Sequence, residues 1–157
     1  MNLQLIEEWY EKYSAGIYRY SLMILGNPHS AEDILQETFI KALKTFNLPK
    51  NPQKIRAWLY TIARNCCYDF LRQKKKEEIS NTEYQKAYSP FFQNTSEVEF
   101  LDMLANLNAI EKEIVSLHIV SGLTHKEIAK VMKFTTASTK KRYERAIHKL
   151  RKEFEEE

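Results

Sequence analysis

The segment AWLYTIARNCCYDFLRQKKK, residues 57–76, combines side chains that could bind a partner through rings, hydrogen bonds and charge. Aromatic, hydroxyl, amide and guanidinium groups recur at three- and four-residue steps, the spacing of one stripe on a helix. These residues are Trp58, Thr61, Asn65, Tyr68 and Arg72. The segment ends in three lysines, residues 74–76. An interleaved apolar stripe is suited to burial against other helices, so the polar stripe is a candidate binding surface.

Basic residues form a second block near the C-terminus. Residues 126–152 hold ten Lys and Arg against two acids, whereas residues 1–76 hold twelve against seven. The whole chain has a net charge of only +3, so its positive charge is concentrated in two places. This distribution indicates two surfaces that face a polyanion.

The C-terminal block has the pattern of a helix-turn-helix. Thr124 and Glu127 can form a capping box, and Ile128, Ala129 and Met132 then face a core. Lys133 occupies the turn position where glycine is usual, at a cost of about 1 kcal/mol. The next helix presents hydroxyl groups and then basic groups, a combination suited to the DNA major groove. Its candidate DNA contacts are Thr135, Thr136, Ser138, Thr139, Lys140, Lys141, Arg142 and Arg145.

Helix signals along the chain predict an all-α protein of two small helical domains joined by a flexible linker. Helices are expected over residues 3–25, from a cap at Ser30, and from Asn51 with Pro52 at its first position. The apolar face of the second helix is expected to include Phe46. In the second half, Asn108 with Glu111 should begin a helix whose core side includes Ile119. The predicted divisions are a first domain at 1–76, a linker at 77–95 and a helix-turn-helix domain at 96–157.

Several function classes lack their signatures. The four histidines have no metal-ligand spacing, Cys66 and Cys67 are adjacent, and no nucleophile or phosphate-loop motif is present. The sequence therefore predicts no enzyme, no metal and no cofactor. No run of eighteen apolar residues occurs, and the N-terminal segment is acidic. We expect a cytoplasmic protein without membrane insertion.

Two ordered motifs carry a family resemblance. SAEDILQETFIKAL followed by IRAWLYTIARNCCYDFLRQKKK closely resembles the first conserved domain of bacterial RNA polymerase sigma factors of the extracytoplasmic-function (ECF) class, in the sigma-70 family. The second half, from about Ser96, resembles the promoter −35 domain of that class. The resemblance covers nearly the whole chain and implies a transcription initiation factor that binds core polymerase and directs it to promoters.

The resemblance also implies roles for particular residues in the first domain. A polar helix face would bind the polymerase β′ clamp helices: Asp33, Gln36, Glu37 and Lys41. In the −10 region, aromatic rings would stack on exposed bases and arginines would hold the backbone, with stacking worth roughly 1–3 kcal/mol per base. The −10 residues are Arg56, Trp58, Thr61, Arg64, Asn65, Tyr68 and Arg72. The loop over residues 47–54 corresponds to a pocket for a flipped base.

In the second domain the resemblance implies −35 duplex reading, and its partners would include the polymerase β flap and an anti-sigma factor. Family members often carry an apolar residue at the position of Thr139 and a basic one at that of Ile147, so the promoter sequence read could differ. The alternative is a free-standing helix-turn-helix regulator that binds duplex DNA without polymerase. A third interpretation is a basic protein that binds a membrane surface. It is the least favoured, because the apolar stripes of the basic helices are needed for the domain cores.

Overall fold

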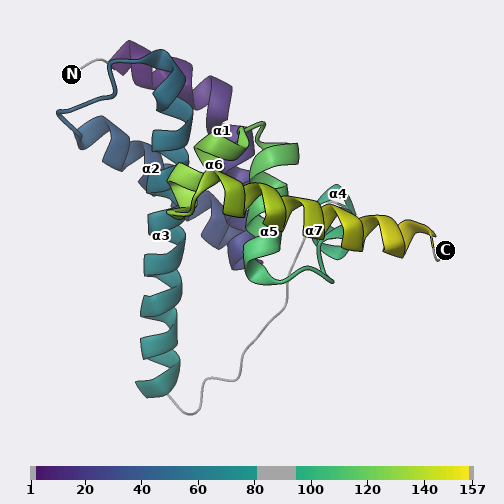
Figure 1. Cartoon of the computed structure of the whole chain (residues 1–157). Coiled ribbons are helices and arrows are strands. Elements are labelled where there is room, and N and C mark those ends of the chain that lie inside the picture. Colours follow the sequence, from purple (N-terminus) through teal and green to yellow (C-terminus); the bar gives the residue numbers. More distant parts are fainter. Residues whose placement is uncertain (1–2, 81–94, 156–157) are drawn as a thin grey trace.

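The computed structural model describes residues 3–80 and 95–155 (Figure 1). The described residues form helices with short connections and contain no strand, which confirms the all-α class. The elements are α1 (Leu3–Leu25), α2 (Pro28–Lys44), α3 (Pro52–Ser80), α4 (Thr95–Met103), α5 (Ala109–Val115), the π-helix η1 (Ser116–Val120), α6 (His125–Met132) and α7 (Thr136–Glu155). Most of the predicted linker lies outside the described residues. The linker was expected to start at residue 77, but α3 continues to Ser80.

Helices α1, α2 and α3 pack on one another and form the first unit. Gly26, at φ 68°, ends α1 in the left-handed conformation that glycine tolerates best. The cap predicted at Ser30 is wrong: Asn27 caps α2, and its Oδ1 accepts a hydrogen bond of 3.1 Å from the Ser30 N–H. Pro28 takes the first helical position, where its missing N–H costs nothing.

Phe46 was predicted on the apolar face of α2, and this is also wrong. Helix α2 ends at Lys44, and Phe46 lies beyond it with its side chain fully exposed. The chain leaves helical geometry at Thr45, at φ −79° and ψ 126°, so the helical period no longer sets the direction of the next side chains.

Helices α4 to α7 form the second unit, in which α5 and α6 pack against α7. Capping boxes are present as predicted at Asn108 with Glu111 and at Thr124 with Glu127. Ile119 was predicted in the core but is 56 % exposed. It lies in η1, whose wider turn changes the helical phase that had placed it on the core side.

The two units pack directly against each other. Helix α3 contacts α6, and α1 contacts α5 and η1, so buried apolar residues of both units form one continuous cluster. Gly16 makes room for Tyr60 within the first unit: a Cβ atom there would lie 2.3 Å from the Tyr60 hydroxyl, and it would be in ordinary contact, at 3.6 Å, with Ser121 Oγ of the second unit. The C-terminal part of α3 and the C-terminal part of α7 extend away from this contact in different directions (Figure 1).

Candidate functional site

The exposed face of α2 carries the four side chains that the resemblance assigns to polymerase binding. Asp33, Gln36, Glu37 and Lys41 are all exposed, and Lys41 Nζ lies 3.3 Å from Glu37 Oε1. The opposite face of α2 packs on α1 and α3, which fixes the direction of the polar face. Ile40 lies three residues after Glu37 on the same face and is 49 % exposed. Sequence reasoning missed this apolar group, although its helical spacing was a usable signal.

Trp58 and Asn65 of α3 lie beside the end of α2. With Lys41, Lys44 and neighbouring groups they line an open depression of about 370 Å³. Trp58 is half-buried, and its ring meets the ring of Trp9 edge to face, with centroids 6.0 Å apart. Trp9 therefore helps to hold the Trp58 ring at the edge of the depression. This geometry suits an aromatic platform with cationic groups nearby.

Thr61 and Arg72 are the other two members of the stripe with local bonds within α3. The Thr61 hydroxyl donates to the backbone carbonyl of Ala57, at 2.8 Å. Arg72, which is exposed, pairs with Asp69 on the preceding turn of α3. Both polar groups can exchange these local bonds for an external partner, because neither bond joins different helices.

Glu113 of α5 binds the other side of α3. Its Oε1 accepts hydrogen bonds from the Tyr20 hydroxyl at 2.7 Å and from Arg64 Nε at 2.8 Å. Its Oε2 accepts from the Tyr68 hydroxyl at 2.7 Å, and the Glu113 side chain is only 2 % exposed. Arg64 also lies over the Tyr68 ring, with its Cζ 4.6 Å from the centroid. A buried carboxylate thus holds two of the predicted −10 side chains against the second unit.

The electrostatics of this cluster follow from burial and from the carboxylate. Burial raises the pKa of the Tyr20 hydroxyl well above 10, and the neighbouring Glu113 raises it further. The pKa of Tyr68 is raised by the same two causes in the same order. Both phenols therefore remain neutral hydrogen-bond donors. For Arg64, burial alone would lower the pKa, but its bond to Glu113 leaves the pKa raised.

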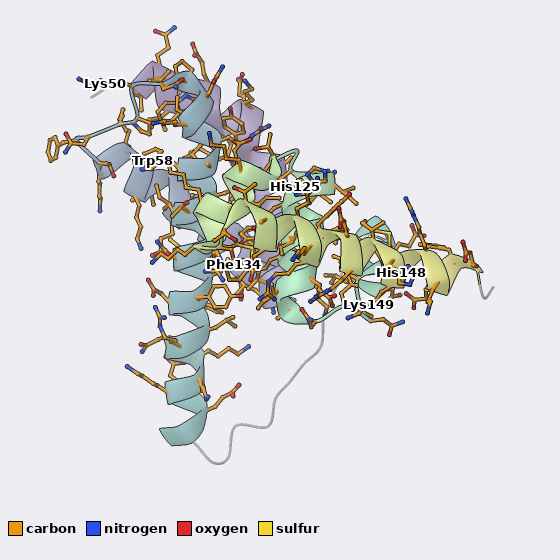
Figure 2. All side chains as sticks on the ribbon, in the orientation of Figure 1. Lys50, Trp58, His125, Phe134, His148 and Lys149 are labelled. Carbon is orange, nitrogen blue, oxygen red and sulfur yellow. The ribbon has the colours of Figure 1, made fainter. Side chains whose placement is uncertain are left out.

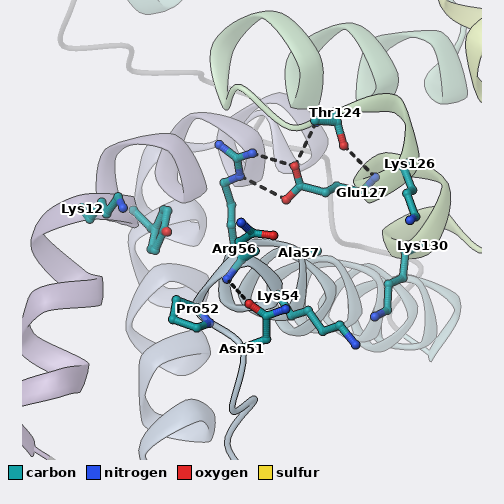
Figure 3. A pocket seen from close by; sticks show the side chains of 12 residues that line it. Lys12, Asn51, Pro52, Lys54, Arg56, Ala57, Thr124, Lys126, Glu127 and Lys130 are labelled. Atoms are coloured by element: carbon teal, nitrogen blue, oxygen red, sulfur yellow. Dashed lines mark hydrogen bonds and ion pairs between the residues drawn. The ribbon is translucent and has the colours of Figure 1, made fainter.

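A second ion pair joins α3 to α6 at the rim of a cleft between the units (Figure 3). Arg56 Nη2 lies 2.6 Å from Glu127 Oε1, and Arg56 Nε donates to Glu127 Oε2 at 3.2 Å. Burial raises the pKa of Glu127, but hydrogen bonds from Arg56 and the Thr124 backbone outweigh it and leave the pKa lowered. The cleft measures about 720 Å³, and its lining includes Lys12, Lys54, Lys126 and Lys130.

These contacts divide the predicted −10 residues into two groups. Arg56, Arg64 and Tyr68 are bonded to acids of the second unit. The other four are half-buried or exposed and, within the described part of the chain, are not bonded to those acids: Trp58, Thr61, Asn65 and Arg72. Helix α3 therefore presents one set of side chains outward while the neighbouring set is occupied within the chain.

The helix-turn-helix places most of its candidate side chains at the surface. Thr135 lies just before α7, and its hydroxyl accepts a hydrogen bond of 3.1 Å from the Ser138 N–H in the first turn of that helix. Arg142 is partly covered: its Nε donates to Ser138 Oγ at 3.2 Å and its Cζ lies 4.9 Å from the Phe134 ring centroid. Figure 2 shows Phe134 near one end of α7 and Lys149 toward the other. The exposed members are Thr135, Thr136, Lys140, Lys141 and Arg145.

Thr139 was predicted to contact DNA, but it lies on the inner face of α7. It is fully buried, and its hydroxyl donates to the Thr135 carbonyl oxygen at 3.0 Å. It therefore faces the core of the second unit and is not among the groups that α7 exposes to a partner.

The acids that bind α3 were missed by sequence reasoning. Glu113 had a usable signal, because it lies three residues after Ile110 and four before Leu117, within the apolar stripe of α5. An acid in such a stripe must find a buried partner. Glu127 was recognised only as a capping residue, a role that it keeps while it binds Arg56.

Within the described residues no cluster of three or more His, Cys, Asp or Glu side chains could hold a metal ion. In the same residues no helix has the length and apolar character that crossing a bilayer requires.

Comparison with known proteins matches both halves of the chain. The sigma-70 region 2 family matches residues 9–77, and the sigma-70 region 4 family matches residues 103–152. The ECF RNA polymerase sigma factor SigM of Bacillus subtilis (strain 168) is 30 % identical over 152 residues, which cover 93 % of each chain. The ECF RNA polymerase sigma factor SigW of the same organism is also 30 % identical, over 90 % of this chain and 84 % of that protein.

The fold agrees with these matches. The sigma factor RpoE from Bartonella quintana, solved in complex with the anti-sigma factor NepR, superposes with a TM-score of 0.72 at 21 % identity, over 96 % of each chain. The order of the two matched regions and the near-complete coverage of SigM identify the family: this chain belongs to the ECF RNA polymerase sigma factors.

Proposed function

We propose that this chain binds core RNA polymerase through the exposed face of α2 and reads promoter DNA with α3 and α7. As a member of its family the chain is a transcription initiation factor and not an enzyme. Its contribution is recruitment and strand opening. Residues 1–76 would supply polymerase docking and −10 opening, and residues 96–157 would supply −35 binding.

The observation that carries the proposal is the polar face of α2. Four side chains at helical spacing, Asp33, Gln36, Glu37 and Lys41, are exposed together with an apolar neighbour, Ile40. Among the described residues, the ion pairs between the two units do not involve this face, so it remains available in the packed structure. A face with charged groups around an apolar contact is suited to binding another protein.

The direct test is binding to purified bacterial core polymerase. Asp33→Lys should weaken co-elution by about tenfold or more, because it places a like charge where a carboxylate docks. Combining Asp33→Lys with Glu37→Lys should abolish co-elution. Glu32→Lys is the matched control: Glu32 is also exposed, and its substitution makes the same charge change on a neighbouring face of α2. Equal losses in Asp33→Lys and Glu32→Lys would contradict a specific docking face.

The promoter contacts are assigned by the groups at the surface. Trp58 and Asn65 would receive an unpaired base at the depression beside α2, with Lys44 close to the DNA backbone. The exposed basic and hydroxyl groups of α7 would contact the −35 duplex. Two such sites held at a fixed separation by polymerase gain affinity from effective concentration.

Two further partners and a location are part of the proposal. The β flap of polymerase would contact the second unit, and an anti-sigma factor would regulate the protein, as NepR binds the similar RpoE. We propose a cytoplasmic location, where core polymerase is found. The free-standing regulator is not favoured, and absence of any complex between the wild-type chain and core polymerase would bring it back.

A further inference from the structure

We propose that Glu113 and Glu127 form a latch that holds the two units together and withholds Arg56, Arg64 and Tyr68 from promoter DNA. Opening of the latch would then precede or accompany promoter binding. This inference rests on the proposed function, since the withheld side chains are those assigned to the −10 element. It adds a competition between the second unit and DNA for the same groups.

The carboxylate of Glu113 occupies the position that a phosphate would need. A phosphate on α3 would be bound by the donors that Arg64 and Tyr68 offer. In the structure those donors point at Glu113, with distances of 2.8 Å from Arg64 Nε and 2.7 Å from the Tyr68 hydroxyl. A carboxylate and a phosphate each accept such bonds through paired oxygens. Glu113 therefore acts as a substitute anion supplied by the chain itself.

The latch residues come from parts of the chain that are distant in sequence. Tyr20 of α1 also donates to Glu113, at 2.7 Å and 93 positions away. Arg56 and Glu127, which form the second pair, are 71 positions apart. Every one of these bonds crosses from the first unit to the second, so all would be lost together when the units separate. Shared loss of several bonds makes the closed state cooperative.

The donors are placed where they could exchange partners. The Arg64 side chain is 25 % exposed and that of Arg56 is 31 % exposed, whereas the side chains of Glu113 and Glu127 are 2 % and 18 % exposed. The arginines thus lie at the edge of the contact and the acids lie farther inside. DNA approaching α3 would meet arginines already bound at the edge and would have to displace the acids.

The energetic consequence is a reduced apparent affinity for any partner that needs the open form. The apparent dissociation constant equals the intrinsic one divided by the fraction of open molecules. Losing one charge-assisted bond changes that fraction by about tenfold or more. Binding of core polymerase across both units would supply the free energy for opening.

The test uses the full chain with neutral substitutions that preserve size. Glu113→Gln and Glu127→Gln remove both charges, and the glutamine introduced by the second substitution can still serve a capping box. Domain separation is measured by small-angle X-ray scattering. Affinity for nucleic acid is measured with fluorescent single-stranded oligothymidylate, whose phosphates Arg56, Arg64 and Tyr68 can bind once they are released. Circular dichroism reports whether each variant is folded.

Glu111→Gln is the matched control. Glu111 is on the same helix as Glu113, is 7 % exposed and binds Lys149, but this pair lies within the second unit. Its substitution removes one negative charge, as each of the two latch substitutions does, without touching the contact between units. Should Glu113→Gln lose its fold, Glu127→Gln alone tests the rim of the latch.

We expect the double variant to have a larger radius of gyration and to bind the oligonucleotide about tenfold or more tightly, because it loses the charge-assisted bonds of both acids. Adding Arg64→Gln should remove most of that gain. The Glu111→Gln control should match wild type. Unchanged size and affinity in the double variant, or an equal gain in the control, would overturn the latch.

The outcome is separable from that of the proposed function. Scattering and oligonucleotide binding need no polymerase, whereas the proposed function is tested by co-elution of the wild-type chain with core polymerase. A wild-type chain that binds polymerase while the variants stay closed removes the latch alone. Failure of wild-type binding removes the proposed function, whatever the variants do.

Discussion

Among single residues, Glu113 shows how one buried side chain can occupy neighbours that would otherwise be available to a partner. Arg64 and Tyr68 belong by type and spacing to a DNA-binding surface, yet in this structure both bind one buried carboxylate. Trp58, two residues from Arg56 on the same helix, has a different environment beside Trp9 and α2. Side-chain chemistry suggests what a residue can bind, and the structure determines what it does bind.

Trp58→Ala should reduce promoter opening. Stacking of one base on an aromatic ring is worth roughly 1–3 kcal/mol, so the open complex should become about tenfold or more less populated. Permanganate reactivity of unpaired thymines with the reconstituted polymerase measures this. Trp58→Phe keeps a ring and should restore most of the signal. Thermal unfolding of both variants controls for the contact with Trp9, and wild-type opening by Trp58→Ala would rule out a platform at this position.

Among the elements, the turn between α6 and α7 has the conformation that the sequence predicts, with a residue that does not suit it. Lys133 has φ 60° and ψ 42°, the left-handed region in which a side chain is strained. Its backbone N–H still bonds to the Ala129 carbonyl and so completes the end of α6. Packing of α6 against α7 supplies the compensating free energy.

Lys133→Gly should therefore stabilise the protein. Glycine adopts this conformation without strain, and the free energy of unfolding should rise by about 1 kcal/mol. Denaturant unfolding measures the change. Lys130→Gly provides the contrast, because Lys130 is exposed in the interior of α6 and glycine there should cost about 1 kcal/mol. A destabilised Lys133→Gly variant would show that the lysine side chain contributes more than its strained backbone costs.

In the molecule as a whole, two units that each contain a basic block are held together partly by acids at their contact. The apolar cluster that spans both units supplies most of the buried contact surface between them. The ion pairs at Glu113 and Glu127 determine which side chains of α3 are covered. This arrangement makes the closed state sensitive to charge. It also makes that state sensitive to pH, because the pKa of Glu127 is shifted.

Acid should open the molecule. The pKa of Glu127 is lowered from its ordinary 4.5 by Arg56 and Thr124, which outweigh the effect of burial. A lowered carboxyl pKa stabilises the closed state fully above the ordinary value, and that stabilisation is lost as the pH falls through the folded pKa. The radius of gyration should stay constant from neutral pH down to about 4.5 and rise below it.

Glu127→Gln should remove its own share of that expansion, whereas Glu111→Gln should retain it, since the latter pair lies within one unit. An acid expansion of the same size in wild type and Glu127→Gln would show that other groups control the opening.

The local structure of this protein could be read from its sequence. The bounds of α1, the start of α3 and the capping boxes at Asn108 and Thr124 follow from interactions within about four residues. Local errors arose where two signals competed, as at α2, where Asn27 and Pro28 begin the helix ahead of Ser30. The π-helix that exposes Ile119 has no comparable local signal.

Packing between the units, by contrast, settles which face of α3 is open and which is closed. The partners of Tyr20, Arg56, Arg64 and Tyr68 lie between 45 and 93 positions away in the chain. No helical period or cap encodes such a pairing, because it depends on how two separately formed units pack. One face of α3 is therefore open to a partner and the other is covered by the second unit, which supplies the acids that bind it.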